Sequence, residues 1–64
     1  MRLRDLREDN DLKQKTIADL LNIKQNTYSQ YENGKREIPM AVLWKLADFY
    51  HTSVDYLIGR TDKQ

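Results

Sequence analysis

The stretch QKTIADLLNIKQNTYSQYENGKR spans residues 14–36 and contains two short helical patterns separated by a break. In the first pattern, at residues 14–21, apolar residues recur at the i, i+3, i+4 spacing of an amphipathic helix. In the second, from residue 25 to about 33, Tyr28 and Tyr31 are the large apolar side chains, and their three-residue spacing places them on one face. The apolar stripe of the first helix consists of Ile17, Ala18, Leu20 and Leu21.

The other face of the second helix carries amides and hydroxyls, where an exposed helix usually carries charges. Such groups make directional hydrogen bonds as donors and acceptors. Amides near the start of a short helix, held across a tight turn by a preceding helix, suit the reading of base edges in the DNA major groove. From the residues alone, an ordinary solvated face and stacking of single-stranded bases on the tyrosines stay open, although the tyrosine spacing favours core packing. The polar face consists of Gln25, Asn26, Ser29 and Gln30.

The composition argues against several classes of protein. Sixty-four residues make one domain with a thin core and little room for a deep enzyme pocket. The chain has no cysteine and one histidine, His51, which we interpret as a helix terminator. We therefore expect a protein that is not an enzyme and that has no metal site and no cofactor. No apolar run approaches the roughly 18 residues of a membrane span, so we expect no membrane partner.

Charge is distributed unevenly along the chain. The net charge is +1, yet residues 13–36 hold five basic residues against two acidic ones. Residues 1–12 and 37–64 each hold three basic residues against four acidic ones. The positive excess thus coincides with the two-helix stretch, which adds modest support for a nucleic-acid partner.

The remaining residues predict three further helices. Residues 1–10 form the first helix, with Leu3 and Leu6 inward. Pro39 opens the fourth helix, where a missing N–H costs nothing. Ser53 is expected to cap a short fifth helix with Val54, Leu57 and Ile58 inward, and Gly59 to close it. For the fourth helix we expect an inward stripe of Met40, Leu43, Trp44, Ala47 and Tyr50, with Leu46 beside it, and a dimer interface stays open as an alternative role for part of Trp44.

These helices predict an all-α globule of five helices in one domain over residues 1–59. Residues 60–64 form a polar tail for which we expect no ordered contacts. Asn22 and His51 follow the second and fourth helices, and both residue types enter the left-handed backbone region more readily than most.

Several short motifs occur together at fixed distances. A Gln-x-x-x-Ala pattern at residues 14–18 is followed by YSQYENGK at 28–35, by Leu-Ala at 46–47 and by SVDYL at 53–57. In this combination the chain resembles the Cro/C1-type (Xre-like) helix-turn-helix domains of phage and bacterial repressors, over about residues 3–59. The resemblance implies a compact five-helix lambda-repressor-like fold and a sequence-specific DNA-binding regulator, usually a repressor that meets its operator as a dimer.

The resemblance also implies roles for individual residues. It places Gln14 at a phosphate and against the start of the recognition helix at residues 25–33, and it pairs Arg7 with Glu32 to link the first helix to the third. Thr27 and Ser29 match positions that contact the DNA backbone or a thymine methyl. The base-reading candidates are Gln25, Asn26, Ser29 and Gln30, and the DNA-backbone candidates are Lys13, Gln14, Lys24, Thr27, Asn33, Lys35 and Arg36.

Two lysines depart from the family pattern. Lys13 and Lys24 stand where many relatives have Ser or Thr before helices two and three. Neither lysine can cap a helix, and each adds positive charge where the helix dipole is already positive. We expect a small loss of stability at each position, which a bound phosphate would reverse.

Two hypotheses follow. The first is a regulator of transcription, in the cytoplasm of a bacterial or phage-infected cell, that binds double-stranded operator DNA with residues 25–33 in the major groove. Near-neutral charge implies weak binding by a monomer, so we expect a homodimer on an inverted repeat, with Tyr56 and Ile58 as the candidate interface by resemblance. The second hypothesis is a protein-interaction module on the same fold, an antitoxin or anti-repressor with little affinity for DNA.

Overall fold

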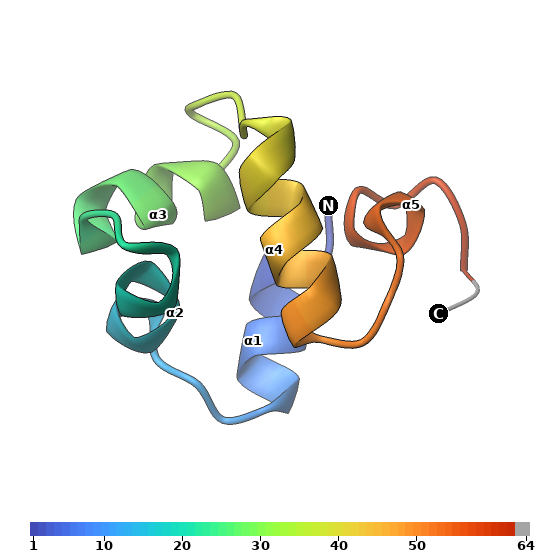
Figure 1. Cartoon of the computed structure of the whole chain (residues 1–64), viewed down its shortest axis with the longest axis horizontal. Helices are drawn as coiled ribbons and strands as arrows, with labels where there is room; N and C mark the ends of the chain where they lie inside the picture. The colour runs from blue at the N-terminus through green and yellow to red at the C-terminus, as the bar shows by residue number, and fades with distance from the viewer. Residues whose placement is uncertain (63–64) are drawn as a thin grey trace.

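The computed structural model describes residues 1–62 and contains five α-helices and no strand within them (Figure 1). The all-α, five-helix fold expected from the sequence is therefore confirmed. None of the helices in this part of the chain is long and apolar enough to cross a membrane. The helices are α1 (Leu3–Asp9), α2 (Gln14–Leu21), α3 (Gln25–Glu32), α4 (Met40–Phe49) and α5 (Val54–Leu57).

Three described residues other than glycine adopt the left-handed backbone conformation, and each of them lies just after a helix. Asp11, Asn22 and His51 have φ values of 54°, 58° and 55°. Asn, Asp and His tolerate this region better than bulky side chains, and it lets the chain turn sharply after a helix. After Asn22, the N–H of Ile23 donates to the carbonyl of Ala18 at 3.0 Å, which satisfies one of the last carbonyls of α2. The two positions that we predicted to be left-handed, Asn22 and His51, are confirmed.

One apolar cluster joins all five helices. Tyr28 is fully buried in it and Tyr31 nearly so, which confirms that the tyrosines of α3 pack inward. Leu20 of the predicted α2 stripe is only half-buried. Burial of each large apolar side chain contributes about 1.5–3 kcal/mol, so α3 is held mainly by its inner face. The cluster consists of Leu3, Leu6, Ile17, Ala18, Leu21, Tyr28, Tyr31, Leu46, Ala47 and Leu57.

The prediction that Trp44 and Met40 face the core is wrong. Their exposed fractions are 61% and 58%, whereas Leu46 on the same helix is fully buried. Residues in an α-helix are about 100° apart, so Trp44 lies roughly 160° around the helix from Leu46 and Met40 roughly 120° from it. The buried face of α4 is centred on Leu43, Leu46 and Ala47, which leaves Trp44 on the outside.

The segment after α5 makes contacts that we did not predict. The Arg2 guanidinium donates to the carbonyl oxygens of Tyr56 and Thr61, both at 3.0 Å, and to Asp62 Oδ1 at 2.8 Å. It also lies over the Tyr56 ring, 4.5 Å from the ring centroid. Our expectation of a tail without ordered contacts is thus wrong for Thr61 and Asp62, because a residue near the other end of the chain holds them. Residues 63–64 of that predicted tail lie outside the described residues.

Candidate nucleic-acid interface

Helix α3 begins directly after a sharp turn from α2 (Figure 1). Lys24, the residue before α3, is extended, with φ −72° and ψ 144°. Gln25 and Asn26 are exposed, while Thr27 is half-buried. Because the chain turns sharply at Asn22, α3 does not continue α2.

A polar hollow lies where α2 meets α3. It has a volume of about 350 Å³ and is lined by Gln14, Gln25, Asn26 and Ser29. The structure thus brings together side chains that the sequence had assigned to base reading and to backbone contact. Their amides and hydroxyl offer both donors and acceptors to a group that enters the hollow.

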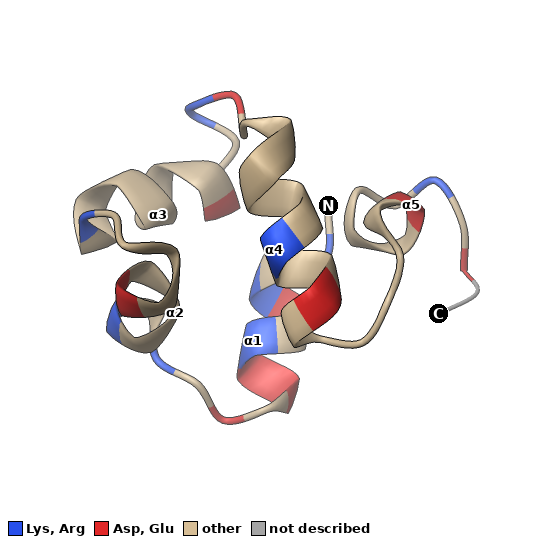
Figure 2. Ribbon diagram, viewed as in Figure 1, with Lys and Arg blue, Asp and Glu red and all other residues tan. Residues whose placement is uncertain are grey.

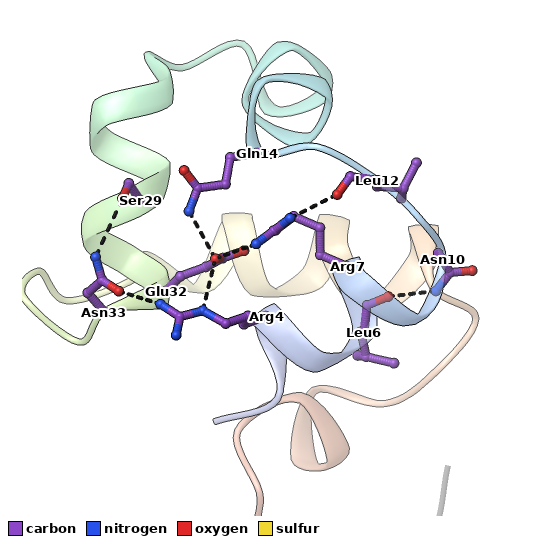
Figure 3. Close-up of polar contacts among 9 residues, drawn as sticks. All are labelled: Arg4, Leu6, Arg7, Asn10, Leu12, Gln14, Ser29, Glu32 and Asn33. Atoms are coloured by element: carbon purple, nitrogen blue, oxygen red, sulfur yellow. Dashed lines mark hydrogen bonds and ion pairs between the residues drawn. The ribbon is translucent and has the colours of Figure 1, made fainter.

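Glu32, the last residue of α3, is the centre of a buried polar cluster (Figure 3). Arg7 Nε donates to Glu32 Oε2 at 2.6 Å, and Arg7 Nη2 donates to Oε1 at 3.1 Å. The side chain of Glu32 is 0% exposed and that of Arg7 is 13% exposed. The pairing of Arg7 with Glu32 that we predicted is therefore present, and it is buried. Arg7 Nη1 also donates to the carbonyl of Leu12 at 2.8 Å, so the same side chain holds the turn after α1.

Gln14 contributes to this cluster in a way that differs from our prediction. Its Nε2 donates to Glu32 Oε1 at 3.0 Å, so the amide braces the C-terminal end of α3 (Figure 3). We expected it to brace the start of that helix, yet Gln14 meets Gln25 and Asn26 only across the polar hollow. Gln14 is the first residue of α2 and Glu32 the last residue of α3, and the packing of these two helices brings the carboxylate within reach of the Gln14 amide.

The cluster shifts the acid–base behaviour of its members. Burial by itself raises the pKa of Glu32, but the hydrogen bonds from Arg7 and Gln14 outweigh burial and hold that pKa below its ordinary value. The hydrogen bond to Glu32 raises the pKa of Arg7. Burial, with the nearby Glu32 carboxylate, raises the pKa of Tyr28. The Tyr28 hydroxyl is close enough to influence Glu32, but it does not reach hydrogen-bonding geometry with any described residue.

Basic groups flank the outer face of α3, which is almost free of charge. Figure 2 shows α3 without colour except for the acidic residue in its last turn, with basic residues before it and in the loop after it. Lys13 and Lys24 precede α2 and α3, and neither side chain makes a capping hydrogen bond. Lys35 and Arg36 are exposed in the loop between α3 and α4. An anion that approaches the α3 face would therefore meet positive charge at both ends of the helix.

Sequence reasoning missed one contact beside this face. Arg4 Nη2 donates to Asn33 Oδ1 at 2.6 Å, and Arg4 Nε is 3.6 Å from Glu32 Oε1 (Figure 3). Arg4 lies on α1, and 29 positions separate it from Asn33 in the chain. The sequence contains no local signal for such a pair, because Arg2, Arg4 and Arg7 all look alike before the fold is known. Among the described residues, no group of three or more His, Asp or Glu side chains is arranged to hold a metal ion.

Comparison with known proteins gives a consistent picture. A family model described as helix-turn-helix matches residues 3–57. The HTH-type transcriptional regulator AnsR of Bacillus subtilis is 41% identical over 59 residues, which cover 92% of this chain and 51% of AnsR. The regulator ImmR of the same organism is 38% identical over 95% of this chain and 48% of its own length. The cryptic phage CTXphi transcriptional repressor RstR of Vibrio cholerae is 33% identical over 95% of this chain and 55% of RstR.

The match is confined to part of each relative, because the chain spans about half the length of the curated relatives it matches. No solved structure matches the chain. The family model nevertheless covers all five helices, and the left-handed turn at Asn22, the exposed start of α3 and the buried Arg7–Glu32 pair all lie within the matched residues. The chain belongs to the Cro/C1-type (Xre-like) helix-turn-helix family.

Proposed function

We propose that the chain is a sequence-specific double-stranded DNA-binding domain of a transcriptional regulator, a repressor that reads the major groove with α3. The observation that carries this proposal is the uncharged amide face at the start of α3, exposed at Gln25 and Asn26 and bordered by basic residues. The relatives are named as regulators, and RstR is named as a repressor. We place its action in the cytoplasm of a bacterial or phage-infected cell.

Base reading falls to the amides. An amide pairs best with adenine, because it donates to N7 and accepts from the N6 amino group, and each bidentate contact discriminates by about 1–3 kcal/mol. Gln25 and Asn26, which are exposed in the first turn of α3, meet bases first. Ser29 and Gln30 are half-buried one turn further along α3 and complete the reading face. We therefore propose half-sites that contain A·T pairs.

Backbone contacts surround the reading face. Gln14 lines the hollow beside α3, where one N–H of its Nε2 stays on Glu32 and the other donates to a phosphate. Phosphate contacts fix the register of the protein on the duplex but carry no sequence information. The proposed set is Lys13, Gln14, Lys24, Thr27, Asn33, Lys35 and Arg36.

Two copies meet the operator as a homodimer in this proposal. Two-fold pairing places the recognition helices about 34–36 Å apart, which corresponds to an inverted repeat. The Tyr56 ring, our first candidate for the interface, is covered by Arg2. Trp44 and Met40 instead remain exposed beside a hollow of about 420 Å³ between α4 and α5, and this supports pairing through that side.

Selection of bound duplexes from a random pool tests the reading proposal. Gln25→Ala should weaken binding to the selected duplex about tenfold or more and leave random duplex nearly unchanged. Lys35→Ala should weaken both equally and flatten the salt dependence. An unchanged operator-to-random ratio in Gln25→Ala contradicts base reading by this residue. Feeble binding of the unaltered chain to every duplex would instead favour the protein-interaction module.

Sedimentation of the chain on the selected duplex tests the pairing proposal. The unaltered chain should bind an inverted repeat as two copies cooperatively and bind an isolated half-site as one. Trp44→Gln should abolish the cooperativity and leave the half-site affinity unchanged, because Trp44 lies outside the reading face. Unaltered cooperativity in Trp44→Gln would place the interface elsewhere.

A further inference from the structure

The three arginines near the N-terminus have different roles in the structure. The Arg2 guanidinium binds the segment around α5, where it donates hydrogen bonds to Tyr56, Thr61 and Asp62. Arg7 is buried and holds Glu32 with two hydrogen bonds. Arg4 differs from both, because 53% of its side chain is exposed and its shorter polar contact, at 2.6 Å, is to the neutral amide of Asn33 and not to the Glu32 carboxylate.

The charge of Arg4 is not balanced locally. Glu32 accepts two hydrogen bonds from Arg7 and one from Gln14, so its negative charge is already compensated by the Arg7 guanidinium. Arg4 comes only to 3.6 Å of Glu32 through Nε. Two arginines therefore share one carboxylate, and the surplus positive charge lies on the exposed guanidinium of Arg4.

The Arg4 contact also fixes the orientation of the Asn33 amide. A guanidinium has five N–H groups and no acceptor, so only the oxygen of the amide can face it. Asn33 Oδ1 therefore accepts from Arg4 at 2.6 Å, and Nδ2 points away, 3.5 Å from Ser29 Oγ (Figure 3). An amide nitrogen carries two N–H groups, so Nδ2 retains a donor for another acceptor. With its acceptor oxygen occupied, the Arg4–Asn33 pair presents donors and positive charge, which is the chemistry of an anion site.

We propose that Arg4 and Asn33 together bind one DNA phosphate at the C-terminal end of the recognition helix, with Arg4 as a direct contact that also positions the Asn33 amide. This inference rests on the proposed function and extends the DNA-facing surface to α1, where we had assigned no contact. The site lies at the opposite end of α3 from Gln25, so α3 is gripped at both ends.

Titration of the selected duplex and of random duplex at several salt concentrations tests this site. Arg4→Met should weaken binding to both duplexes about tenfold, because a charge-assisted hydrogen bond is lost. It should also lower the slope of log affinity against log salt by about 0.9, the value for one phosphate. Arg60→Met is the matched control, because it removes the same charge from an exposed residue after α5 and should leave the slope unchanged.

The role of Arg4 towards Asn33 has its own readout. Asn33→Ala should weaken binding without changing the salt slope, because a neutral donor is removed. In Arg4→Met the Asn33 amide is no longer held in place. Adding Asn33→Ala to Arg4→Met should therefore reduce DNA-binding affinity clearly less than Asn33→Ala does in the unaltered chain. Arg4→Lys should restore the slope but not the contribution of Asn33, since an ammonium lacks the planar guanidinium that now spans Glu32 and Asn33. If Asn33→Ala reduces DNA-binding affinity by the same factor in the unaltered chain, in Arg4→Met and in Arg4→Lys, Arg4 does not position the Asn33 amide.

Failure of the inference and failure of the proposed function are distinguishable. If the unaltered chain prefers no duplex, the proposed function fails and Arg4 is irrelevant to it. If the chain binds its duplex and Lys35→Ala lowers the slope while Arg4→Met behaves like Arg60→Met, only the Arg4 site is overturned. Arg4→Gln provides a second neutral variant should Arg4→Met fail to fold. The slope of its log affinity against log salt tests the site in the same way.

Discussion

The Arg7–Glu32 pair permits a quantitative test of how the domain is held together. Arg7→Met removes the guanidinium and keeps a side chain of similar reach. The Glu32 carboxylate then stays buried, at 0% side-chain exposure, with the Gln14 amide at 3.0 Å and the Arg4 guanidinium at 3.6 Å as its remaining partners. A buried charge without its partner is unfavourable because the interior does not replace its hydration.

The structure sets the expected magnitude. Removal of one partner from a buried ion pair costs about 3–5 kcal/mol. We expect the lower end, about 3 kcal/mol, because Arg4 and Gln14 partly compensate Glu32. A 64-residue domain has a free energy of unfolding of about 3–10 kcal/mol, so this one change should remove a third or more of it. Arg7→Met with Glu32→Gln should recover at least about 1.5 kcal/mol relative to Arg7→Met alone, since no buried charge remains.

Urea unfolding followed by circular dichroism measures these differences. The control is Lys15→Met, which breaks the Lys15–Asp19 pair of 3.1 Å whose side chains are 70% and 67% exposed. An exposed pair at i, i+4 contributes less than about 0.5 kcal/mol, so this variant should be almost unaffected. A loss below about 1 kcal/mol in Arg7→Met, or strict additivity with Glu32→Gln, would refute the view that Glu32 is desolvated and dependent on its partner.

Three further outcomes follow from the same structure. The pKa of Glu32 is lowered on folding, so its contribution to the free energy of unfolding should be complete above the unfolded pKa of about 4.3 and be lost as pH falls through the folded pKa. Urea unfolding at several pH values measures this dependence, and Glu32→Gln should remove it. The Tyr28 hydroxyl is buried without a hydrogen-bond partner among the described residues, so Tyr28→Phe should leave the free energy of unfolding unchanged or raise it by up to about 1 kcal/mol; a loss of more than that would reveal a partner. Lys24→Ser should stabilise the fold by about 0.5–1 kcal/mol through a new N-cap and weaken DNA binding at low salt, with thermal unfolding and the duplex titration as the two measurements.

Local signals were sufficient to predict most of the fold. The bounds of α2 agree with the prediction of residues 14–21 because the apolar stripe and the left-handed Asn22 are properties of neighbouring residues. Ser53 likewise caps α5, where its Oγ accepts from the N–H of Tyr56 at 3.0 Å. Such features depend on the sequence within one turn of a helix.

The errors concern contacts between distant parts of the chain. Both faces of α4 carry large apolar residues, and the helices packed around α4 determine that Leu46 is buried and Trp44 is exposed. The partners of Arg2 and Arg4 lie 54 and 29 positions away. No periodicity in the sequence distinguishes these arginines from Arg7. Base reading, contact with the DNA backbone and pairing of two copies are predictions, because each depends on a molecule outside this chain.

The placement of Glu32 connects the small size of the domain to its proposed function. A core of this size leaves a two-turn helix held by two tyrosines on one face. Glu32 adds a hydrogen-bonded anchor at the end of α3, because Arg7 from α1 and Gln14 from α2 both donate to its carboxylate. Directional bonds of this kind fix the rotation of a helix more sharply than apolar packing does. The outer face of α3 can then carry uncharged hydrogen-bonding groups, because the ion pair that orients the helix, Arg7 with Glu32, lies on its inner side.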